Sequence, residues 1–506
     1  MPAMDLHEIL TWLQAAAPAA QLSSDSRSIA PGDVFFAYPS DAADGRAYIA
    51  NAIENGAQAV LYEAEGGVWD GAWNVPHLAV TGLKNMAGRI AGMVYGQPDS
   101  ALFSVAVTGT NGKTSCTQWL GHALSCLGQP TVVIGTLGIG LFKLGAHGAF
   151  NATGYTTPDA VLLQRRLAQA RDAGAKALAI EASSIGLDQG RMNGMHVDSA
   201  LFTNFTRDHL DYHGDMAAYE ASKTALFDWP GLQHAIVNLD DAMGLRLVQR
   251  LRQTRPAVAI IGYTLLENAV EGVATLRAGA IHTSHAGTSF VLESPFGSAR
   301  VKTQLVGQFN VSNVLGILGV LLAKGTSWQA AIQAVEALRA VPGRMQQLGG
   351  HDAPLIVIDY AHTPDALEKT LASLHQVARE RNGQLWCVFG CGGDRDPGKR
   401  PQMGAASLAA DHVVVTSDNP RGETPSSIIT QIVVGMGAAL QAPQLIEDRA
   451  AAILYAVRHA AKHDVILLAG KGHETTQEIQ GRKRPFLDAD HAALALAARA
   501  SMKGAA

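Results

Sequence analysis

The feature that most constrains this chain is the stretch 105–115, which reads V-A-V-T-G-T-N-G-K-T-S. An apolar run ends at Thr108, a glycine-rich turn follows, and apolar residues at helical spacing continue from Cys116 until Gly128. A strand, a tight turn and a helix N-terminus direct unpaired backbone N–H groups and the positive end of a helix dipole at one point. The stretch therefore predicts an α/β domain whose first loop cradles phosphate groups.

The end of this loop has the side chains that a nucleoside triphosphate needs. Lys113 is placed to neutralise the β- and γ-phosphates, and Thr114 offers a hydroxyl group to Mg²⁺. The usual pattern, G-x-x-x-x-G-K-[ST], has glycine at the position of Val107. An ordinary glycine turn is the alternative interpretation, and the strand–turn–helix context argues against it.

The composition excludes several classes of protein. A net charge of −5 in 506 residues gives no basic surface for nucleic acid. The 4 cysteines match no disulfide framework or zinc pattern, so reduced cytosolic thiols are expected. The N-terminus lacks the basic segment of a signal peptide, and the apolar run 314–323 is about half a membrane span, which predicts a buried helix. We therefore expect a cytoplasmic protein that does not insert into membranes.

The order of apolar segments predicts an α/β fold of three domains: a small α/β domain over 1–98, a central domain with a P-loop-type parallel sheet over 99–342, and a C-terminal Rossmann-like α/β domain over 343–506. Continuous apolar runs that alternate with helical patterns indicate parallel sheets covered on both faces. Residues 272–302 alternate more and are expected to form an antiparallel insertion. The predicted strands are 34–37, 59–62, 102–108, 131–134, 177–181, 197–203, 235–238, 257–261, 355–359, 385–389, 412–416 and 465–468.

Polar side chains at the ends of the central strands are the first candidates for chemistry, because ligands of open α/β sheets bind beyond the carboxyl ends of the strands. Glu181 ends the strand 177–181, and His209 follows the strand 197–203 next to Asp208. Both are candidate ligands of Mg²⁺. The alternatives are a solvated strand end for Glu181 and a structural role for His209.

Residue type alone leaves two further positions open. Lys223 lies in a helical pattern and reads as an ordinary surface lysine. Asn310 and Asn313, three residues apart on one helix face, could bind adenine or cap their own helix.

The last domain places four polar clusters directly after its predicted strands, at 359–362, 390–396, 418–421 and 470–474. Four such clusters on one rim are more than solvation requires. Arg395 and Arg421 suit bidentate binding of carboxylates, and surface arginines are the alternative.

These motifs together resemble one family. Their order along the chain is the order seen in the Mur ligases, the ATP-dependent amide-forming enzymes of peptidoglycan synthesis: T-G-T-N-G-K-T-S, E-A-S-S, N-F-T-R-D-H-L-D-Y-H-G, G-Q-F-N-V-S-N, P-G-R-M, D-Y-A-H-T-P-D and D-N-P-R. The resemblance covers nearly the whole chain. Within the family, D-N-P-R at 418–421 resembles the diaminopimelate-adding type, and S-D-S-R at 24–27 resembles its uridine-nucleotide site.

The resemblance implies a ligase that uses ATP and Mg²⁺ to join meso-2,6-diaminopimelate to the D-Glu γ-carboxylate of UDP-N-acetylmuramoyl-L-Ala-D-Glu. The carboxylate would first become an acyl phosphate, and the amine of diaminopimelate would then displace phosphate. The three domains would bind the UDP-sugar, ATP and the amino acid in that order along the chain. The implied partners are small molecules, and a monomer is expected.

The resemblance also implies roles residue by residue. Catalysis would depend on Lys113, Glu181, His209 and a carbamylated Lys223, and the metal on Thr114, Glu181, His209 and Lys223. ATP would be held by Thr110, Asn111, Gly112, Lys113, Thr114, Ser115, Asn310, Arg344 and Asp359. The UDP-muramoyl dipeptide would be held by Ser24, Ser26, Tyr155, Thr156, Thr157, Ser183, Gln189 and Arg191. Diaminopimelate would be held by Arg395, Asp418, Asn419, Pro420, Arg421, Gly470 and Glu474.

The chain departs from the family pattern at two places. Relatives often have S-S-H-G where this chain has S-S-I-G at 183–186, and Tyr155 stands where some relatives have Asn. The first removes any role of that His, and the second puts one substrate contact in doubt. Two other functions remain as alternatives: an amide ligase of the lysine-adding or folate type, and a nucleotide-binding switch without catalysis.

Overall fold

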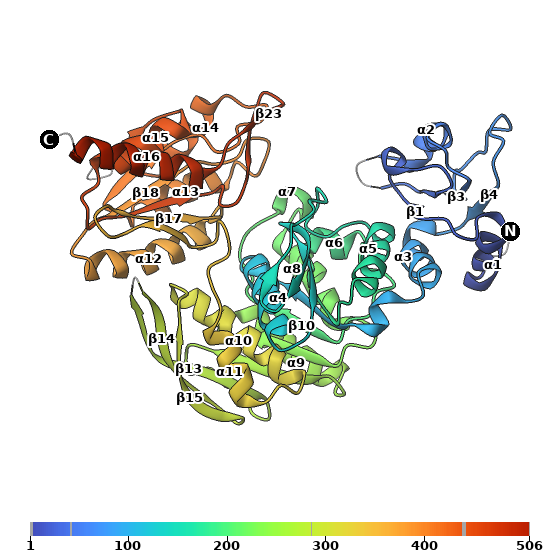
Figure 1. The fold of residues 1–506 in the computed structure, drawn as a ribbon, viewed down its shortest axis with the longest axis horizontal. Coiled ribbons are helices and arrows are strands. Elements are labelled where there is room, and N and C mark those ends of the chain that lie inside the picture. The colour runs from blue at the N-terminus through green and yellow to red at the C-terminus, as the bar shows by residue number, and fades with distance from the viewer. Residues whose placement is uncertain (1–3, 41–42, 285, 438–441, 505–506) are drawn as a thin grey trace.

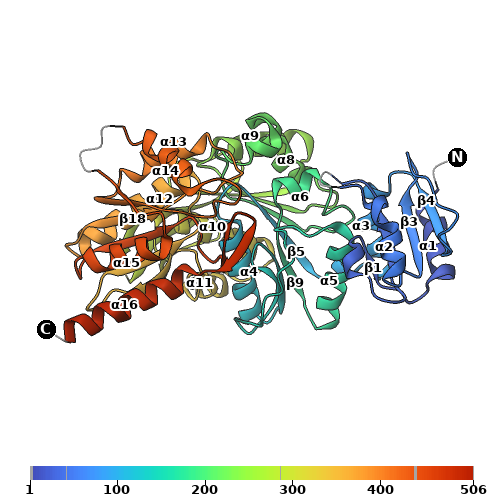
Figure 2. The ribbon, with the colours of Figure 1, turned by 90° about the horizontal axis from the view of Figure 1, so that it is seen from above.

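The computed structural model describes residues 4–40, 43–284, 286–437 and 442–504. Three large sheets, each with its own helices, follow one another along the chain, and a separate two-stranded sheet lies in the last part (Figure 1). Seen from above, the first lies at one end of an elongated molecule, the second in the middle and the third at the other end (Figure 2).

The first part is a parallel sheet in the order β1-β2-β3-β4. Helices α1 and α3 pack on one face of this sheet and α2 on the other. Strands β2 and β3 are buried at every residue, as continuous apolar runs predict. The elements are α1 (Leu6–Ala16), β1 (Leu22–Ser23), η1 (Ser26–Ser28), β2 (Val34–Ala37), η2 (Gly45–Tyr48), α2 (Ile49–Glu54), β3 (Ala59–Glu63), β4 (His77–Val80), α3 (Leu83–Val94) and η3 (Pro98–Ala101).

The central part is built on a sheet of 11 strands in the order β15-β14-β13-β12-β11-β10-β5-β9-β6-β7-β8. The strands from β13 to β6 in this order run parallel to one another, and antiparallel strands extend both edges. The strands are β5 (Phe103–Thr108), β6 (Thr131–Gly135), β7 (Gly138–Lys143), β8 (Ala146–His147), β9 (Ala177–Glu181), β10 (Ser199–Phe202), β11 (His234–Asn238), β12 (Ala259–Thr264), β13 (Ala274–Ser284), β14 (Gly287–Ser294) and β15 (Gly297–Thr303).

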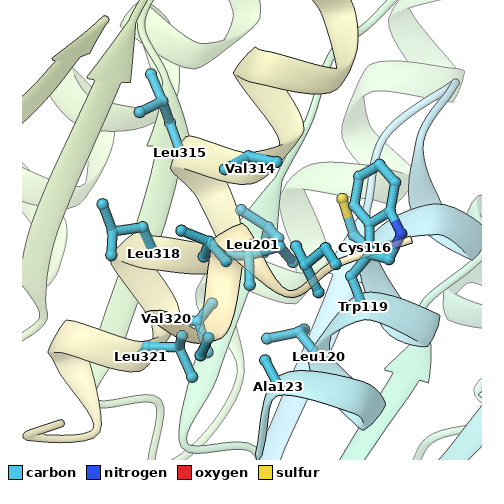
Figure 3. Close-up of a cluster of buried hydrophobic side chains, with 14 of the residues drawn as sticks. Cys116, Trp119, Leu120, Ala123, Leu201, Val314, Leu315, Leu318, Val320 and Leu321 are labelled. Atoms are coloured by element: carbon cyan, nitrogen blue, oxygen red, sulfur yellow. The ribbon is translucent and has the colours of Figure 1, made fainter. Parts of the chain in front are cut away.

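Side chains along a strand alternate between the two faces of a sheet, so the apolar strands of the central sheet present apolar side chains on both faces. Helices cover both of these faces. Val105 and Val107 of β5 face α4 (Lys113–Cys126), α10 (Gln308–Ala323) and α11 (Trp328–Glu336). Ala106 faces α5 (Ala160–Asp172) and α9 (Ala242–Thr254). Figure 3 shows the first core, where Trp119 and Leu120 of α4 lie against Leu201 of β10 and the apolar side of α10. Shorter elements follow the strand ends: α6 (Ser184–Asp188), α7 (Leu210–His213), α8 (Met216–Thr224) and η4 (Ala225–Asp228).

The last part has a sheet in the order β16-β17-β21-β18-β19-β20, parallel except for β16. Thr363 caps α12 and Pro364 begins it, as predicted, and Leu367, Leu371 and Leu374 are buried. The elements are β16 (Gln346–Gly349), β17 (Leu355–Asp359), α12 (Pro364–Glu380), β18 (Leu385–Phe389), α13 (Lys399–Ser407), β19 (His412–Val415), α14 (Pro425–Val434), β20 (Gln444–Leu445), α15 (Arg449–His459), β21 (Val465–Ala469), β22 (Thr476–Ile479), β23 (Arg482–Pro485) and α16 (Asp488–Gly504).

The α/β fold and all the predicted strands are confirmed at nearly the predicted bounds. The expected insertion at 272–302 is wrong in one respect. These residues form antiparallel hairpins, but β13 pairs in parallel with β12 and so extends the central sheet. The segment 314–323 is the buried part of α10, and within the described ranges no helix is long and apolar enough to span a membrane. All four cysteines are free.

Candidate active site

The phosphate loop lies between β5 and α4 at the carboxyl edge of the central sheet. Gly109 and Gly112 have φ angles of 144° and 88°. A Cβ atom at Gly109 would lie 1.9 Å from Thr203 Oγ1, and one at Gly112 would lie 2.9 Å from Asn313 Oδ1. No side chain caps the first N–H groups of α4. The N–H groups of Thr110 and Asn111 donate to Asn204, so the donors that an anion could use are those at the start of α4, beside the two glycines.

Val107 explains why the loop lacks the first glycine of the usual pattern. It lies inside β5, fully buried, and pairs with Glu181 of β9. The tight turn begins two residues later, at Gly109, so a glycine at 107 would remove core packing without serving the turn.

Two lysines meet at the carbonyl oxygen of Gly109. Lys113 Nζ donates to this oxygen at 2.8 Å and to Thr110 O at 2.9 Å, and Lys223 Nζ donates to Gly109 O at 2.8 Å. Lys223 is 1% exposed and lies over the ring of Tyr219, whose hydroxyl contacts Thr110 Oγ1. The interpretation of Lys223 as a surface lysine is therefore wrong, because the fold turns this side of α8 under the phosphate loop.

The electrostatic surroundings of Lys223 favour its uncharged amine. Burial lowers its pKa well below the ordinary value of 10.5, the neighbouring ammonium of Lys113 lowers it further, and Asp208 opposes the change. Burial also lowers the pKa of Lys113, although Glu181 and Asp208 oppose this.

Glu181 is 1% exposed, so the interpretation as a solvated strand end is also wrong. Its Oε1 accepts from the backbone N–H of Thr136 at 2.9 Å, and its Oε2 accepts from Thr136 Oγ1 at 3.0 Å. Thr136 Oγ1 in turn lies 3.2 Å from Thr156 Oγ1. The carboxylate is thus fixed at the sheet edge between the phosphate loop and the loop containing Thr156.

His209 lies in the loop after β10 with a φ of 53°, a backbone conformation that is uncommon outside glycine. Its Nε2 is 3.6 Å from Asp208 Oδ2, and His362 Nε2 from the last part of the chain is 3.7 Å from the same oxygen. Burial alone would raise the pKa of Asp208, but His362 and His209 outweigh burial and hold this pKa below its ordinary value. One carboxylate therefore bridges the central and last domains.

A cavity of about 480 Å³ lies between these two domains, lined by the phosphate loop, α10, Asp359, Tyr360 and the start of α12. Arg344 spans it: its Nη2 donates to Thr114 Oγ1 at 3.0 Å, and its guanidinium lies over the ring of Tyr360. Asp359 Oδ2 accepts from the N–H of Met345 at 2.8 Å, which fixes the backbone beside Arg344.

Asn310 and Asn313 both line this cavity. Asn310 Nδ2 donates to Val306 O at 2.8 Å, whereas Gly307 is the N-cap of α10 and no side-chain hydrogen bond caps it, so the capping alternative for Asn310 is wrong. Asn313 lies against Gly112 of the phosphate loop. Asn313 therefore packs α10 against the loop, and both amides line the wall of a nucleotide-sized space.

The residues expected to hold the muramoyl dipeptide form one cluster beside Glu181. Thr157 Oγ1 donates to Glu181 O at 2.8 Å and lies 2.9 Å from Ser183 Oγ. Arg191 donates from Nη1 to Thr157 O at 2.9 Å and from Nε to Gln189 Oε1 at 2.8 Å. The ring of Tyr155, which is 58% exposed, lies 4.5 Å from the Arg191 guanidinium. Tyr155, which stands where some relatives have Asn, thus shields one face of the Arg191 guanidinium.

The first domain joins this cluster through Ser24. Its Oγ donates to Asp159 Oδ1 at 2.7 Å, and Asp159 also caps α5. Ser26 is buried in η1, next to the exposed ion pair of Asp25 and Arg27. The S-D-S-R motif therefore lies where the first and central domains meet.

The residues expected to bind diaminopimelate converge on the rim of the last sheet. Asn419 Nδ2 donates to Glu474 Oε2 at 2.7 Å, and Asp418 Oδ2 lies against Gly470. Arg421 has a φ of 50° and donates from Nη1 to Gly393 O at 2.7 Å. Pro420 is buried and packs its backbone against Gly393, whereas Arg395 is exposed.

Three residues of the site were not singled out from sequence. Thr136 follows the strand 131–134, so the strand-end rule that found Glu181 could have found it. Tyr219 and Lys471 gave no such signal: Tyr219 looks like an ordinary helix residue, and Lys471 sits in a polar cluster without a role of its own. Their importance is visible only in the contacts that the fold creates.

A nucleotide fits the residues that are present. The cradle at Gly109 and Gly112 admits no Cβ atom, and the buried Nε of Arg344 has no hydrogen-bond partner within the described chain. Among the described residues, no three His, Cys, Asp or Glu side chains gather as a metal site. Mg²⁺ commonly takes one or two carboxylates with phosphate oxygens and water, so the Thr114 hydroxyl and the Glu181 carboxylate are suitable donors.

The phosphate loop lies on a parallel sheet and faces a Rossmann-like domain across this cavity. This arrangement places the protein in the class of nucleotide-binding α/β enzymes. Comparison with known proteins narrows this class. Residues 19–95 match the Mur ligase family catalytic domain, 107–321 the Mur ligase middle domain, and 343–472 the Mur ligase glutamate ligase domain. The chain belongs to the Mur ligase family.

Individual relatives agree with this assignment. A protein of Janthinobacterium sp. (strain Marseille), named UDP-N-acetylmuramoyl-L-alanyl-D-glutamate–2,6-diaminopimelate ligase, is 69% identical over 99% of this chain and 98% of its own length. A solved structure with the same name has 37% identity and a TM-score of 0.66, covering 95% of both chains. The fold is shared with a MurF ligase from Thermotoga maritima in complex with ADP, at 17% identity and a TM-score of 0.64 over 96% of this chain and 98% of that one.

Proposed function

We propose that this chain is the ATP-dependent ligase that adds meso-2,6-diaminopimelate to the D-Glu γ-carboxylate of UDP-N-acetylmuramoyl-L-Ala-D-Glu, giving ADP and phosphate. The observation that supports this most directly is the meeting of two sets of strand-end loops. Arg207 Nη2 lies 3.4 Å from Asp396 Oδ2, and His362 and Asp208 make a second contact between the same domains. The loop beside Arg395 therefore adjoins the phosphate-binding edge of the central sheet.

The reaction needs positioning and charge neutralisation more than a protein nucleophile. The γ-carboxylate oxygen attacks the γ-phosphorus of ATP, the bond to ADP breaks, and an acyl phosphate forms. The amine of diaminopimelate, after losing a proton, attacks the acyl carbon, and phosphate leaves. Lys113, whose Nζ now donates to Gly109 O, and the uncapped N-terminus of α4 would neutralise the phosphates, and Arg344 would bring a further positive charge from the last domain.

The metal ligands in this proposal are Thr114, Glu181, His209 and a carbamylated Lys223. When bound, Mg²⁺ supplies positive charge that neutralises the phosphate oxygens. The lowered pKa of Lys223 supports its modification, because only an uncharged amine attacks CO₂. The N–C bond forms as an N–H proton is lost to water, and the product is an anion with oxygen ligands suited to a hard cation.

Glu181, held by Thr136, would orient the part of the same site that binds the muramoyl dipeptide. Thr157, Ser183, Gln189 and Arg191 would hold the dipeptide beside Glu181, and Ser24 and Ser26 would hold the uridine nucleotide. Closure of the last domain over the cavity would exclude water from the acyl phosphate. A cytoplasmic location is proposed, since both substrates and ATP are small soluble molecules, and the monomer stays a prediction.

The experiment that tests this function is phosphate release from ATP with the UDP-muramoyl dipeptide and either meso-diaminopimelate or L-lysine. We expect release that depends on both the UDP-sugar and diaminopimelate, with a far higher kcat/KM than for lysine. Release with lysine would support a lysine-adding enzyme, release with a folate and glutamate would support a folate-type ligase, and ATP hydrolysis without any UDP-sugar would support a nucleotide switch.

A further inference from the structure

Lys471 is a buried charged residue to which no role has been given. It lies two residues after the end of β21 and has 0% side-chain exposure. Its Nζ donates to Glu474 Oε2 at 2.9 Å, to Asn419 Oδ1 at 3.2 Å and to Thr476 O at 2.8 Å. An ammonium has three hydrogens, so these contacts use all of its donors.

The contacts of Lys471 determine which way the Asn419 carboxamide faces. Asn419 Oδ1 accepts from Lys471 Nζ and from the backbone N–H of Glu478 at 3.0 Å. Both partners are donors without acceptor capacity, so the amide oxygen must point toward them. The Asn419 Nδ2 then points to Glu474 Oε2, at 2.7 Å.

The two carboxylate oxygens of Glu474 differ in their hydrogen bonds. Oε2 accepts from both Lys471 and Asn419, whereas Oε1 accepts no hydrogen bond from the part of the chain that the structure describes. The Glu474 side chain is 29% exposed and Lys471 is not exposed at all. Glu474 therefore stands between the buried lysine and the accessible rim, with one oxygen held and one available.

We propose that Lys471 is a positioning residue of the amino-acid site: it holds the Asn419 amide and Glu474 Oε2 so that Glu474 Oε1 is directed at an ammonium group of the incoming amino acid. This rests on the proposed function, in which Asn419 and Glu474 bind diaminopimelate. Lys471 touches no reacting atom in this scheme. It acts through the two side chains that it orients, and a substrate ammonium would pair with the oxygen that Lys471 leaves unused.

The test is a comparison of three KM values in the Lys471→Met variant, measured by phosphate release. Methionine keeps the length of the side chain but removes its charge and its donors. We expect KM for diaminopimelate to rise about 10- to 100-fold, the usual cost of a hydrogen bond between charged groups, with KM for ATP and for the UDP-sugar within about twofold. Lys302→Met, at an exposed position of strand β15, is the matched control and should change none of the three.

A second pair of variants covers the case in which Lys471→Met does not fold. In Glu474→Gln, the two donors would hold the new amide oxygen, and the amide NH₂ would face the substrate ammonium. We therefore expect Glu474→Gln to raise KM for diaminopimelate at least as much as Glu474→Ala. A glutamine free to turn would present its oxygen and retain binding, so near-normal KM in Glu474→Gln would overturn the proposal.

Two further results would also overturn it: an unchanged KM for diaminopimelate in Lys471→Met, or an equal rise in all three KM values, which indicates a structural role. Failure of the proposed function is recognised separately, in the unaltered protein. If that protein accepts lysine instead of diaminopimelate, the same variants are assayed with lysine, which also carries ammonium groups. If no amino acid stimulates phosphate release, the proposed function and this inference both fall.

Discussion

Lys223 in the central domain and Lys471 in the last domain are both buried, at 1% and 0% exposure, but their surroundings are opposite. The ammonium of Lys471 is paired with the carboxylate of Glu474 and the amide of Asn419. Lys223 donates to the carbonyl oxygen of Gly109, which it shares with a second cation, Lys113. A buried charge is tolerated when it is paired, and an unpaired one tends to lose its charge.

The difference teaches what each lysine can do. Lys471 can act as a fixed counter-ion that orients its neighbours. Lys223 has a pKa pushed well below its ordinary value, so its amine is available for reaction with CO₂. In the two proposals the same residue type would position substrate-binding side chains in one domain and be modified by CO₂ in the other, and the neighbouring groups account for the difference.

The largest expected effect is that of Lys223→Ala. Loss of the anionic carbamate should lower kcat at least about 10²- to 10³-fold, since electrostatic groups of this kind contribute that much to the transition state. Acetate or formate should restore part of the activity by supplying the missing carboxylate. Lys176→Ala, at an exposed site, is the control. The carbamate assignment would be wrong if no carboxylate restores activity and a crystal structure shows an unmodified lysine.

Arg421→Ala tests whether the last domain reads the far end of the amino acid. That end of diaminopimelate has a carboxylate as well as an ammonium, whereas lysine has the ammonium alone. The Arg421 side chain is 24% exposed, and a bound amino acid would bury it further. An arginine buried in this way without a carboxylate partner costs roughly 2–5 kcal/mol, so the variant should lose about 30-fold or more of the preference for diaminopimelate over lysine. The measurement is the ratio of the two kcat/KM values, and an unchanged ratio would exclude this role.

Thr136→Val tests whether Glu181 must be held in place. Valine has nearly the same shape but lacks the hydroxyl that donates to Glu181 Oε2, while the backbone N–H to Oε1 remains. One lost hydrogen bond to a charged group should lower kcat/KM about tenfold. Thr136→Ser keeps the hydroxyl and should remain close to the unaltered protein. Equal losses in both variants would assign the effect to packing.

Labelling with ¹³C-bicarbonate compares the two lysines directly. The paired ammonium of Lys471 should not react, whereas the amine of Lys223 should give a single carbamate resonance in the NMR spectrum. The resonance should persist in Lys471→Met and disappear in Lys223→Ala. A resonance that survives in Lys223→Ala would place the modification elsewhere.

His473, two residues after Lys471, should affect the stability of the fold rather than the reaction. Burial, with Arg344 and Lys471 nearby, lowers its pKa from 6.5 to about 4. Between these pH values the unfolded chain binds a proton that the folded protein does not, so the free energy of unfolding falls as pH falls from 6.5 to 4. The loss should be on the order of 1–3 kcal/mol in denaturant unfolding. His473→Gln should show a flatter pH dependence across this range, and an unaltered slope would contradict the assignment.

Much of the molecule could be predicted from local pattern. Strands such as 177–181 are continuous apolar runs. Thr363 and Pro364 are neighbours in the sequence, and together they are a typical N-cap and first residue of a helix. The phosphate loop could also be predicted from the sequence, because its donors are backbone groups of consecutive residues. The extension of the sheet by β13 could not be, since pairing with β12 depends on residues that the intervening loop brings together.

The sequence by itself determined the fold class, the phosphate loop and, through its motifs, the resemblance to one family. Tertiary structure alone decided the state of single side chains: it buried Lys223 against a second lysine, fixed Glu181 on Thr136, and paired Lys471 with Glu474. The physical reason is range. Backbone conformation follows from neighbours along the chain, whereas burial and charge pairing depend on groups that lie close together only after folding.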